Sequence, residues 1–136
     1  MTPWLSGKSV LIVEDEFLIG LMLTKEIERA GGTTIGPATS VADALKEIET
    51  RVIDLVILDA KLVDGSGADL AVCIEERRIP YVVVSGYDEV DLPSGLRRAP
   101  FIAKPISVPV LLEAIEGLSA GLMPTERSSW SSADRL

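Results

Sequence analysis

The sequence contains no histidine, and this absence excludes several functions before any pattern is considered. Without histidine the chain cannot act as a histidine kinase or as a histidine phosphotransfer protein, and it cannot build a Ser-His-Asp triad. It also lacks the commonest ligand of transition metals. Any chemistry must therefore use carboxylates, lysine, hydroxyl groups or a hard cation.

Cysteine is nearly absent as well, because Cys73 is the single cysteine in the chain. One cysteine excludes an internal disulfide framework and a cysteine-rich metal site. Residues 1–5 lack the features of a signal peptide, and no apolar run approaches the ~18 residues that a membrane span needs. We therefore expect a cytoplasmic protein that does not insert into a membrane.

Basic residues are in the minority, with 13 Lys and Arg against 21 Asp and Glu and a formal charge of -8. Nucleic acid binding depends on neutralising phosphates with Lys and Arg, so direct nucleic acid binding is not expected. The length of 136 residues and the apolar content of 47% fit one compact domain, with no room for a separate output domain.

Short apolar runs rich in β-branched residues predict buried strands at residues 9–13, 55–58 and 81–84. Runs without polar alternation are typical of strands that are covered on both faces of a parallel sheet. Residues 33–36 and 101–103 predict two weaker strands, the first of them at an edge of the sheet.

Apolar residues spaced three and four positions apart predict helices between these strands. The predicted helices start near Ile19 and after Ser40, Ser66 and Ser107. Ser40 and Ser66 each precede an acidic residue by three positions, which is the pattern of an N-terminal cap. Residues 88–100 contain prolines and few periodic apolar positions, so any helix there should be short or irregular.

The alternation of strands and helices predicts a single α/β domain, with a five-stranded parallel sheet and helices on both faces. We expect the domain to cover residues 8–119, after an N-terminal extension of residues 1–7. Residues 120–136 contain several serines and no apolar period, which predicts a flexible C-terminal tail.

Polar residues stand at the ends of four predicted strands, where an open α/β sheet binds its ligands. They are Glu14 and Asp15, Asp59, Ser85, and Lys104. If the first and third strands are neighbours, the three acids converge, and unit charges ~4 Å apart repel by about 4 kcal/mol at an effective dielectric near 20. Mg²⁺ would relieve this repulsion, because it takes oxygen ligands and bridges to phosphoryl oxygens.

Asp59 is the candidate nucleophile, because a carboxylate can form an acyl phosphate. Phosphoryl transfer also needs positive charge and hydrogen-bond donors, which Mg²⁺, Lys104 and Ser85 would supply. Taken singly, Asp59 could cap a turn and Lys104 could be a solvated charge, but the coincidence at four strand ends favours a site. Glu16 is interpreted as an acid in the first turn of the following helix, where the helix dipole favours it.

Four motifs in this order resemble the receiver domain of bacterial two-component response regulators. They are the acidic motif in residues 11–16, the acceptor strand in residues 56–59, the hydroxyl motif in residues 84–86, and Lys104 followed by Pro105. The resemblance implies a flavodoxin-like strand order of 2-1-3-4-5. It also implies that Asp59 accepts a phosphoryl group from a histidine kinase or a histidine phosphotransfer protein.

The resemblance further implies a magnesium site formed by Asp15, Asp59 and the backbone carbonyl of Lys61, and by Glu14 either directly or through water. Such a domain catalyses only its own Mg²⁺-dependent phosphorylation and dephosphorylation, and it signals by phosphorylation-dependent binding to a downstream protein.

Other positions correspond to residues that respond to phosphorylation in the family. The resemblance implies that Ser85 and Lys104 bind the phosphoryl group and that Phe101 occupies the position of the switch aromatic. Lys61 and Tyr87 stand two residues after the acceptor and two after the hydroxyl, where bulk and charge can gate the access of water to phosphorus.

Residues 80–87 also resemble a subgroup whose fourth strand reads Pro-Phe-x-Phe-Ala-Thr-Gly-Tyr and whose fourth helix is short or unformed. Here the segment reads Pro-Tyr-Val-Val-Val-Ser-Gly-Tyr, so the match is partial. The subgroup consists of small alphaproteobacterial regulators that work with a distinct class of histidine kinases.

Two other functions fit parts of the pattern. A pseudo-receiver would act only as a protein-binding module, but the presence of Asp15, Asp59, Ser85 and Lys104 argues against it. A phosphatase with an aspartyl nucleophile usually has an acid two residues after that nucleophile, where this sequence has Lys61.

Overall fold

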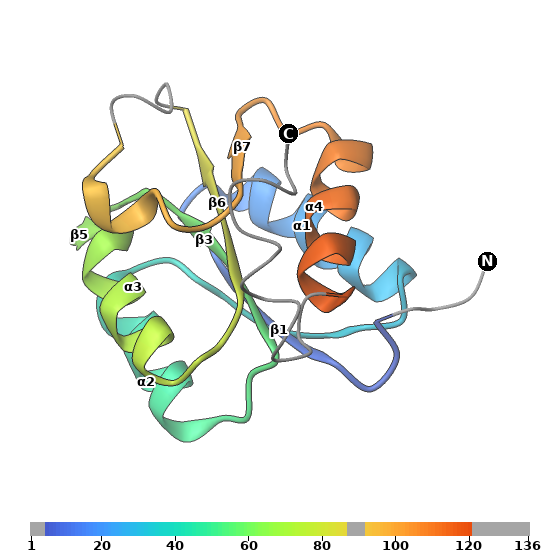
Figure 1. Ribbon diagram of the computed structural model, residues 1–136, viewed down its shortest axis with the longest axis horizontal. Coiled ribbons are helices and arrows are strands. Elements are labelled where there is room, and N and C mark those ends of the chain that lie inside the picture. The colour runs from blue at the N-terminus through green and yellow to red at the C-terminus, as the bar shows by residue number, and fades with distance from the viewer. Residues whose placement is uncertain (1–4, 87–91, 121–136) are drawn as a thin grey trace.

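A computed structural model describes residues 5–86 and 92–120 and places a parallel sheet at the centre of the molecule (Figure 1). The strands of this sheet are β1 (Ser9–Val13), β2 (Thr33–Ala38), β3 (Leu55–Asp59), β6 (Tyr81–Ser85) and β7 (Phe101–Ala103). Their order is β2-β1-β3-β6-β7, and neighbouring strands are parallel. This order confirms the predicted 2-1-3-4-5 arrangement, because β4 and β5 form a separate pair.

Burial along the strands agrees with the apolar patterns. β3 and β6 are buried at every residue, as strands in the middle of a sheet with helices on both faces must be. β2 lies at one edge of the sheet, which confirms its predicted position. Only two of its residues, Ile35 and Ala38, are buried.

Helices cover both faces of the sheet (Figure 1). α1 (Phe17–Arg29) and α4 (Val108–Ala120) pack on one face, and α2 (Val41–Thr50) and α3 (Gly67–Glu76) pack on the other. Leu5, which the sequence assigns to an N-terminal extension, is buried in the core on the α1 and α4 side. Its N–H donates to the Ala30 carbonyl at 3.0 Å, so Leu5 is held to the residue that follows α1.

The predicted helix starts at Ser40 and Ser66 are confirmed. Ser40 accepts a hydrogen bond from the Asp43 N–H at 3.1 Å, and Ser66 and Asp69 form a reciprocal capping box. Between β6 and β7, the only helix among the described residues is the short 3-10 helix η2 (Ser94–Leu96), in agreement with the predicted irregular segment. Within the described parts of the chain, no helix is long and apolar enough to cross a membrane.

A small hairpin directly after β3 is absent from the sequence-based prediction. It consists of β4 (Lys61–Leu62) and β5 (Gly65–Ser66), and strands of two residues are too short to produce a recognisable period. Asp64 lies between these strands and accepts hydrogen bonds from the first backbone N–H groups of α2, at 2.6 and 3.3 Å. The loop after the β3 carboxyl end is therefore held to α2 as well as to α3.

Gly67 is packed tightly against the backbone of Asp59. A Cβ atom at position 67 would lie 2.5 Å from the Asp59 backbone oxygen and 3.2 Å from Leu58 Cγ. We expect Gly67→Ala to lower the free energy of unfolding by roughly 1–3 kcal/mol, because buried backbone must move to admit the methyl group. Urea unfolding measures the effect, with Gly86→Ala as the control, since a Cβ there meets no atom within 4 Å. Equal losses of stability in the two variants would contradict this packing.

Candidate functional site

The register of the sheet brings Glu14 beside Asp59. Val13 pairs with Leu58 across β1 and β3, so the residues that follow them lie next to each other at the carboxyl ends of the strands. One carboxylate oxygen from each of Glu14, Asp15 and Asp59 lies within 4.8 Å of the other two. The three acids that the sequence expects to converge are thus brought together.

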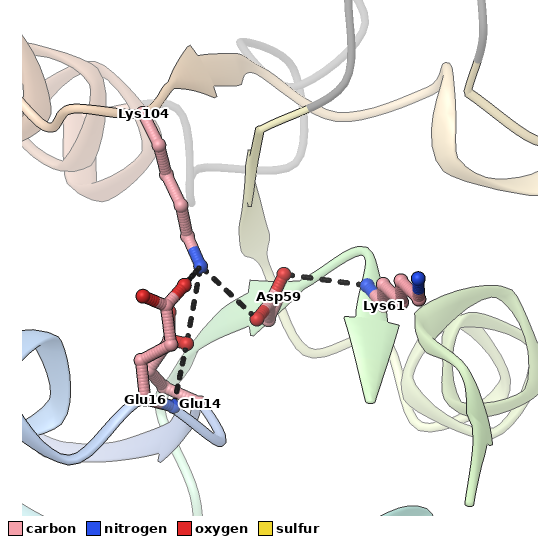
Figure 2. A network of polar contacts seen from close by, with 5 residues as sticks. All are labelled: Glu14, Glu16, Asp59, Lys61 and Lys104. Carbon is pink, nitrogen blue, oxygen red and sulfur yellow. Dashed lines mark hydrogen bonds and ion pairs between the residues drawn. The ribbon is translucent and has the colours of Figure 1, made fainter. Parts of the chain in front are cut away.

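Lys104 approaches these carboxylates from β7. Ser85 pairs with Ala103 across β6 and β7, and the Lys104 N–H donates to the Ser85 carbonyl at 2.8 Å. Figure 2 shows the Lys104 side chain extending toward the acids, with Nζ 3.1 Å from Glu14 Oε2 and 3.2 Å from Asp59 Oδ2. Ser85 is itself buried, with 1% of its surface exposed, at the end of β6.

Glu16 is a third partner of Lys104, so the sequence-based interpretation of this residue is wrong. Its Oε1 accepts a hydrogen bond from Lys104 Nζ at 2.7 Å, the shortest of the three contacts. α1 begins at Phe17, which makes Glu16 the N-cap residue rather than a first-turn acid, and its side chain makes no capping hydrogen bond. Because 88 positions separate Glu16 from Lys104, no local pattern could reveal the pair.

Lys61 contacts Asp59 from the opposite side (Figure 2). Its backbone N–H donates to Asp59 Oδ1 at 3.3 Å. An open cavity of about 410 Å³ is lined by residues from all these loops, namely Asp15, Glu16, Asp59, Lys61, Gly86 and Lys104. Asp59 is therefore both buried among polar partners and accessible from this cavity.

Of the other predicted residues, Phe101 lies apart from these contacts. Phe101 begins β7, is half-buried and packs against the core on the α2 and α3 side. Tyr87 lies outside the residues that the structure describes. The gating role predicted for Tyr87 and Lys61 stays a prediction, as does the metal-binding role of the Lys61 carbonyl.

Burial and mutual proximity shift the pKa values of the central groups. Loss of hydration, followed by the hydrogen bond with Asp59, raises the pKa of Glu14 to about 7. Burial also raises the pKa of Asp59, against the opposing effects of Glu14, Lys104 and the Lys61 N–H. Burial alone would lower the pKa of Lys104, but the hydrogen bond to Glu16 and the negative charge of Asp59 outweigh it and hold that pKa above its usual value.

The donor set fits a hard divalent cation. Glu14 Oε1 is buried and has no hydrogen-bond partner among the described residues, and such an atom is costly to bury unless something else contacts it. The clustered carboxylates supply the oxygen ligands that Mg²⁺ prefers, and the open cavity leaves space for water and a phosphoryl group. Glu14, Asp15 and Asp59 are therefore the residues that could hold this ion.

The raised pKa of Glu14 makes the stability of the metal-free protein depend on pH. The folded state binds this proton more tightly than the unfolded state, so the free energy of unfolding should fall as pH rises from 4.5 to about 7. The shift corresponds to at most about 3 kcal/mol. We expect Glu14→Gln to remove most of this fall in urea unfolding at about pH 5 and about pH 7.5, without added metal. An unchanged pH dependence in the variant would contradict the assignment to Glu14.

Comparison with known sequences places the chain among bacterial regulators. The sequence pattern of the response regulator receiver domain matches residues 10–116. The transcriptional regulatory protein PdtaR of Mycobacterium tuberculosis is 35% identical over 113 residues, which cover 80% of this chain and 55% of PdtaR. The polar-differentiation response regulator DivK of Brucella abortus is 32% identical over 117 residues, which cover 80% of this chain and 94% of DivK. The chain thus spans little more than half the length of PdtaR and nearly all of DivK.

Comparison with solved structures also finds receiver domain proteins with the same fold. The solution structure of SdrG from Sphingomonas melonis Fr1 matches with a TM-score of 0.71 and 33% identity, over 80% of this chain and 93% of SdrG. The crystal structure of a CheY-like receiver domain protein from Methanospirillum hungatei JF-1 matches with a TM-score of 0.73 and 26% identity, over 80% of this chain and 90% of that protein. These matches agree with the resemblance predicted from the four motifs.

Proposed function

Because the chain belongs to the response regulator receiver domain family, we propose that it signals through phosphorylation of Asp59 by a histidine kinase or a histidine phosphotransfer protein. The observation that carries the proposal is the environment of the Asp59 carboxylate. It opens to the cavity and lies between the backbone N–H of Lys61 and the ammonium of Lys104. Two hydrogen-bond donors, one of them cationic, thus contact the two oxygens of the carboxylate that would carry the phosphoryl group.

The proposed reaction transfers a phosphoryl group from a phosphohistidine of the partner. A carboxylate oxygen of Asp59 forms the new P–O bond while the P–N bond of the phosphohistidine breaks, and the departing imidazole takes up a proton. Lys104 Nζ, which lies 3.2 Å from Asp59 Oδ2, would donate to a phosphoryl oxygen. Ser85, at the end of the neighbouring strand, would be the second side-chain donor.

Glu14, Asp15 and Asp59 would hold Mg²⁺, with the Lys61 carbonyl as a further ligand. When bound, Mg²⁺ supplies positive charge that offsets the carboxylates and the phosphoryl oxygens. The cation would relieve the repulsion among the three acids. It would also offer a contact to Glu14 Oε1, which is buried and has no hydrogen-bond partner within the described parts of the chain.

The signal would reach a downstream protein through β7. Lys104 follows β7 directly, and its N–H is bonded to the Ser85 carbonyl, so a new contact to Lys104 acts on both strands. Phe101, at the other end of this three-residue strand, is half-buried and would change its packing with the phosphorylation state. A changed surface at β6 and β7 then binds a different partner.

Phosphotransfer profiling tests the proposal. Purified histidine kinases and phosphotransfer proteins, labelled with radioactive phosphate on histidine, are mixed with the chain in Mg²⁺, and label on the chain is followed over time. We expect fast transfer from at least one of these donors. If neither these proteins nor acetyl phosphate labels the chain while it still binds a kinase, the pseudo-receiver alternative holds instead.

A further inference from the structure

Lys104 has one carboxylate partner that the proposed phosphoryl chemistry does not account for. Its ammonium contacts Glu16 at 2.7 Å, Glu14 at 3.1 Å and Asp59 at 3.2 Å (Figure 2). An ammonium group has three N–H donors, so all of them are engaged. A phosphoryl oxygen can be bound by Lys104 only when at least one of these contacts is released.

Glu16 differs from the other two partners in its surroundings. Glu14 and Asp59 belong to the three-carboxylate cluster, whereas Glu16 does not. The Glu16 side chain is 60% exposed, against 0% for Glu14 and 5% for Asp59. Among the described residues, Lys104 is the one hydrogen-bond or ion-pair partner of the Glu16 carboxylate. The Glu16 carboxylate therefore interacts with Lys104 and does not belong to the carboxylates that would hold the cation.

We propose that Glu16 is a positioning residue that acts through Lys104. By accepting one ammonium hydrogen at the rim of the cavity, it weakens the hold of Lys104 on Glu14 and Asp59 and leaves these two carboxylates available to a divalent cation. The inference rests on the proposed function, because it concerns how the same site is made ready for its metal. Without Glu16, the whole attraction of Lys104 falls on the two buried carboxylates, and the ammonium competes there with Mg²⁺.

The charge of Glu16 could also favour cation binding directly, and this direct effect must be separated from positioning through Lys104. Any acid near a cation site strengthens cation binding through its charge, whether or not it touches Lys104. The two effects differ in their dependence on Lys104, since the positioning effect disappears when the ammonium is removed. A double-mutant cycle measures this dependence.

The cycle uses the unphosphorylated full chain and Mg²⁺ alone, titrated by calorimetry into wild type, Glu16→Gln, Lys104→Gln and the double variant. We expect Glu16→Gln to raise the Kd for Mg²⁺ about fivefold in the wild-type background and less than about twofold in the Lys104→Gln background. Glu16→Asp, which keeps the charge, should restore most of the affinity, and Glu28→Gln on the exposed face of α1 should leave it unchanged. Equal fold-changes in both backgrounds, or a wild type that binds no Mg²⁺, would overturn the proposal.

A second readout needs neither metal nor phosphate. NMR of the lysine ammonium groups in the metal-free chain reports how fast the Lys104 Nζ hydrogens exchange with water, and Glu16→Gln should make this exchange several-fold faster. Unchanged exchange would also count against the positioning role. Both readouts are independent of phosphotransfer: a chain that shows the Glu16 effect but accepts no phosphoryl group would refute the proposed function alone.

Discussion

Asp59→Asn is expected to abolish phosphotransfer to this chain, with a loss of at least about 1000-fold in rate from any phosphohistidine donor. Asparagine has nearly the size of aspartate and can keep the hydrogen bond from the Lys61 N–H, but its amide oxygen cannot form an acyl phosphate. Since burial already raises the pKa of Asp59, removing its charge should not destabilise the fold.

The measurement is the initial rate of label transfer from one autophosphorylated kinase to wild type and variant. Asp43→Asn is the matched control, because Asp43 is an exposed acid on α2 and the same chemical change there should leave the rate unaltered. Thermal unfolding checks that both variants are folded. Transfer to Asp59→Asn at a rate near that of wild type would show that another carboxylate is the acceptor.

Removal of Mg²⁺ is expected to slow phosphorylation by at least about 100-fold. Without the cation, a phosphoryl group must approach three carboxylates whose oxygens lie within 4.8 Å of one another, and Lys104 alone cannot neutralise them. The electrostatic cost of adding further negative charge in this partly buried place is correspondingly large.

Rates are compared in excess EDTA and after Mg²⁺ is restored in excess, which controls for damage by the chelator. In a parallel titration, Asp15→Asn should raise the Kd for Mg²⁺ about tenfold, whereas Asp43→Asn should leave it unchanged. A full rate of phosphorylation in EDTA, or an unaltered Kd for Asp15→Asn, would contradict the role of the acidic cluster.

Much of the fold could be predicted from the sequence, because its strongest signals are local. The apolar runs that became β1, β3 and β6 are continuous and β-branched, and Ser40 and Ser66 mark helix starts by short-range hydrogen bonds. The predicted polar residues of the site could be located for the same reason, since each one ends a strand or lies within two residues after it.

The features that the sequence could not reveal depend on distant pairs or very short elements. The side chains of Glu16 and Lys104 meet although 88 positions separate them, and Asp64 accepts hydrogen bonds from the first N–H groups of α2 across 22 and 23 positions. Leu5 falls in the segment that the sequence assigns to an N-terminal extension, and only the structure shows that it packs in the core beside Ala30. None of these contacts follows from periodicity or from capping patterns.

Phosphoryl acceptance at Asp59 can be tested most directly by chemical trapping. The chain is phosphorylated in Mg²⁺ by a phosphohistidine donor or by acetyl phosphate, reduced with borohydride, digested and sequenced by mass spectrometry. Reduction of an aspartyl phosphate leaves homoserine, so we predict homoserine at position 59 and unmodified acids at Glu14, Asp15 and Glu16. A reduction product at any of these other carboxylates, with aspartate intact at position 59, would contradict the assignment.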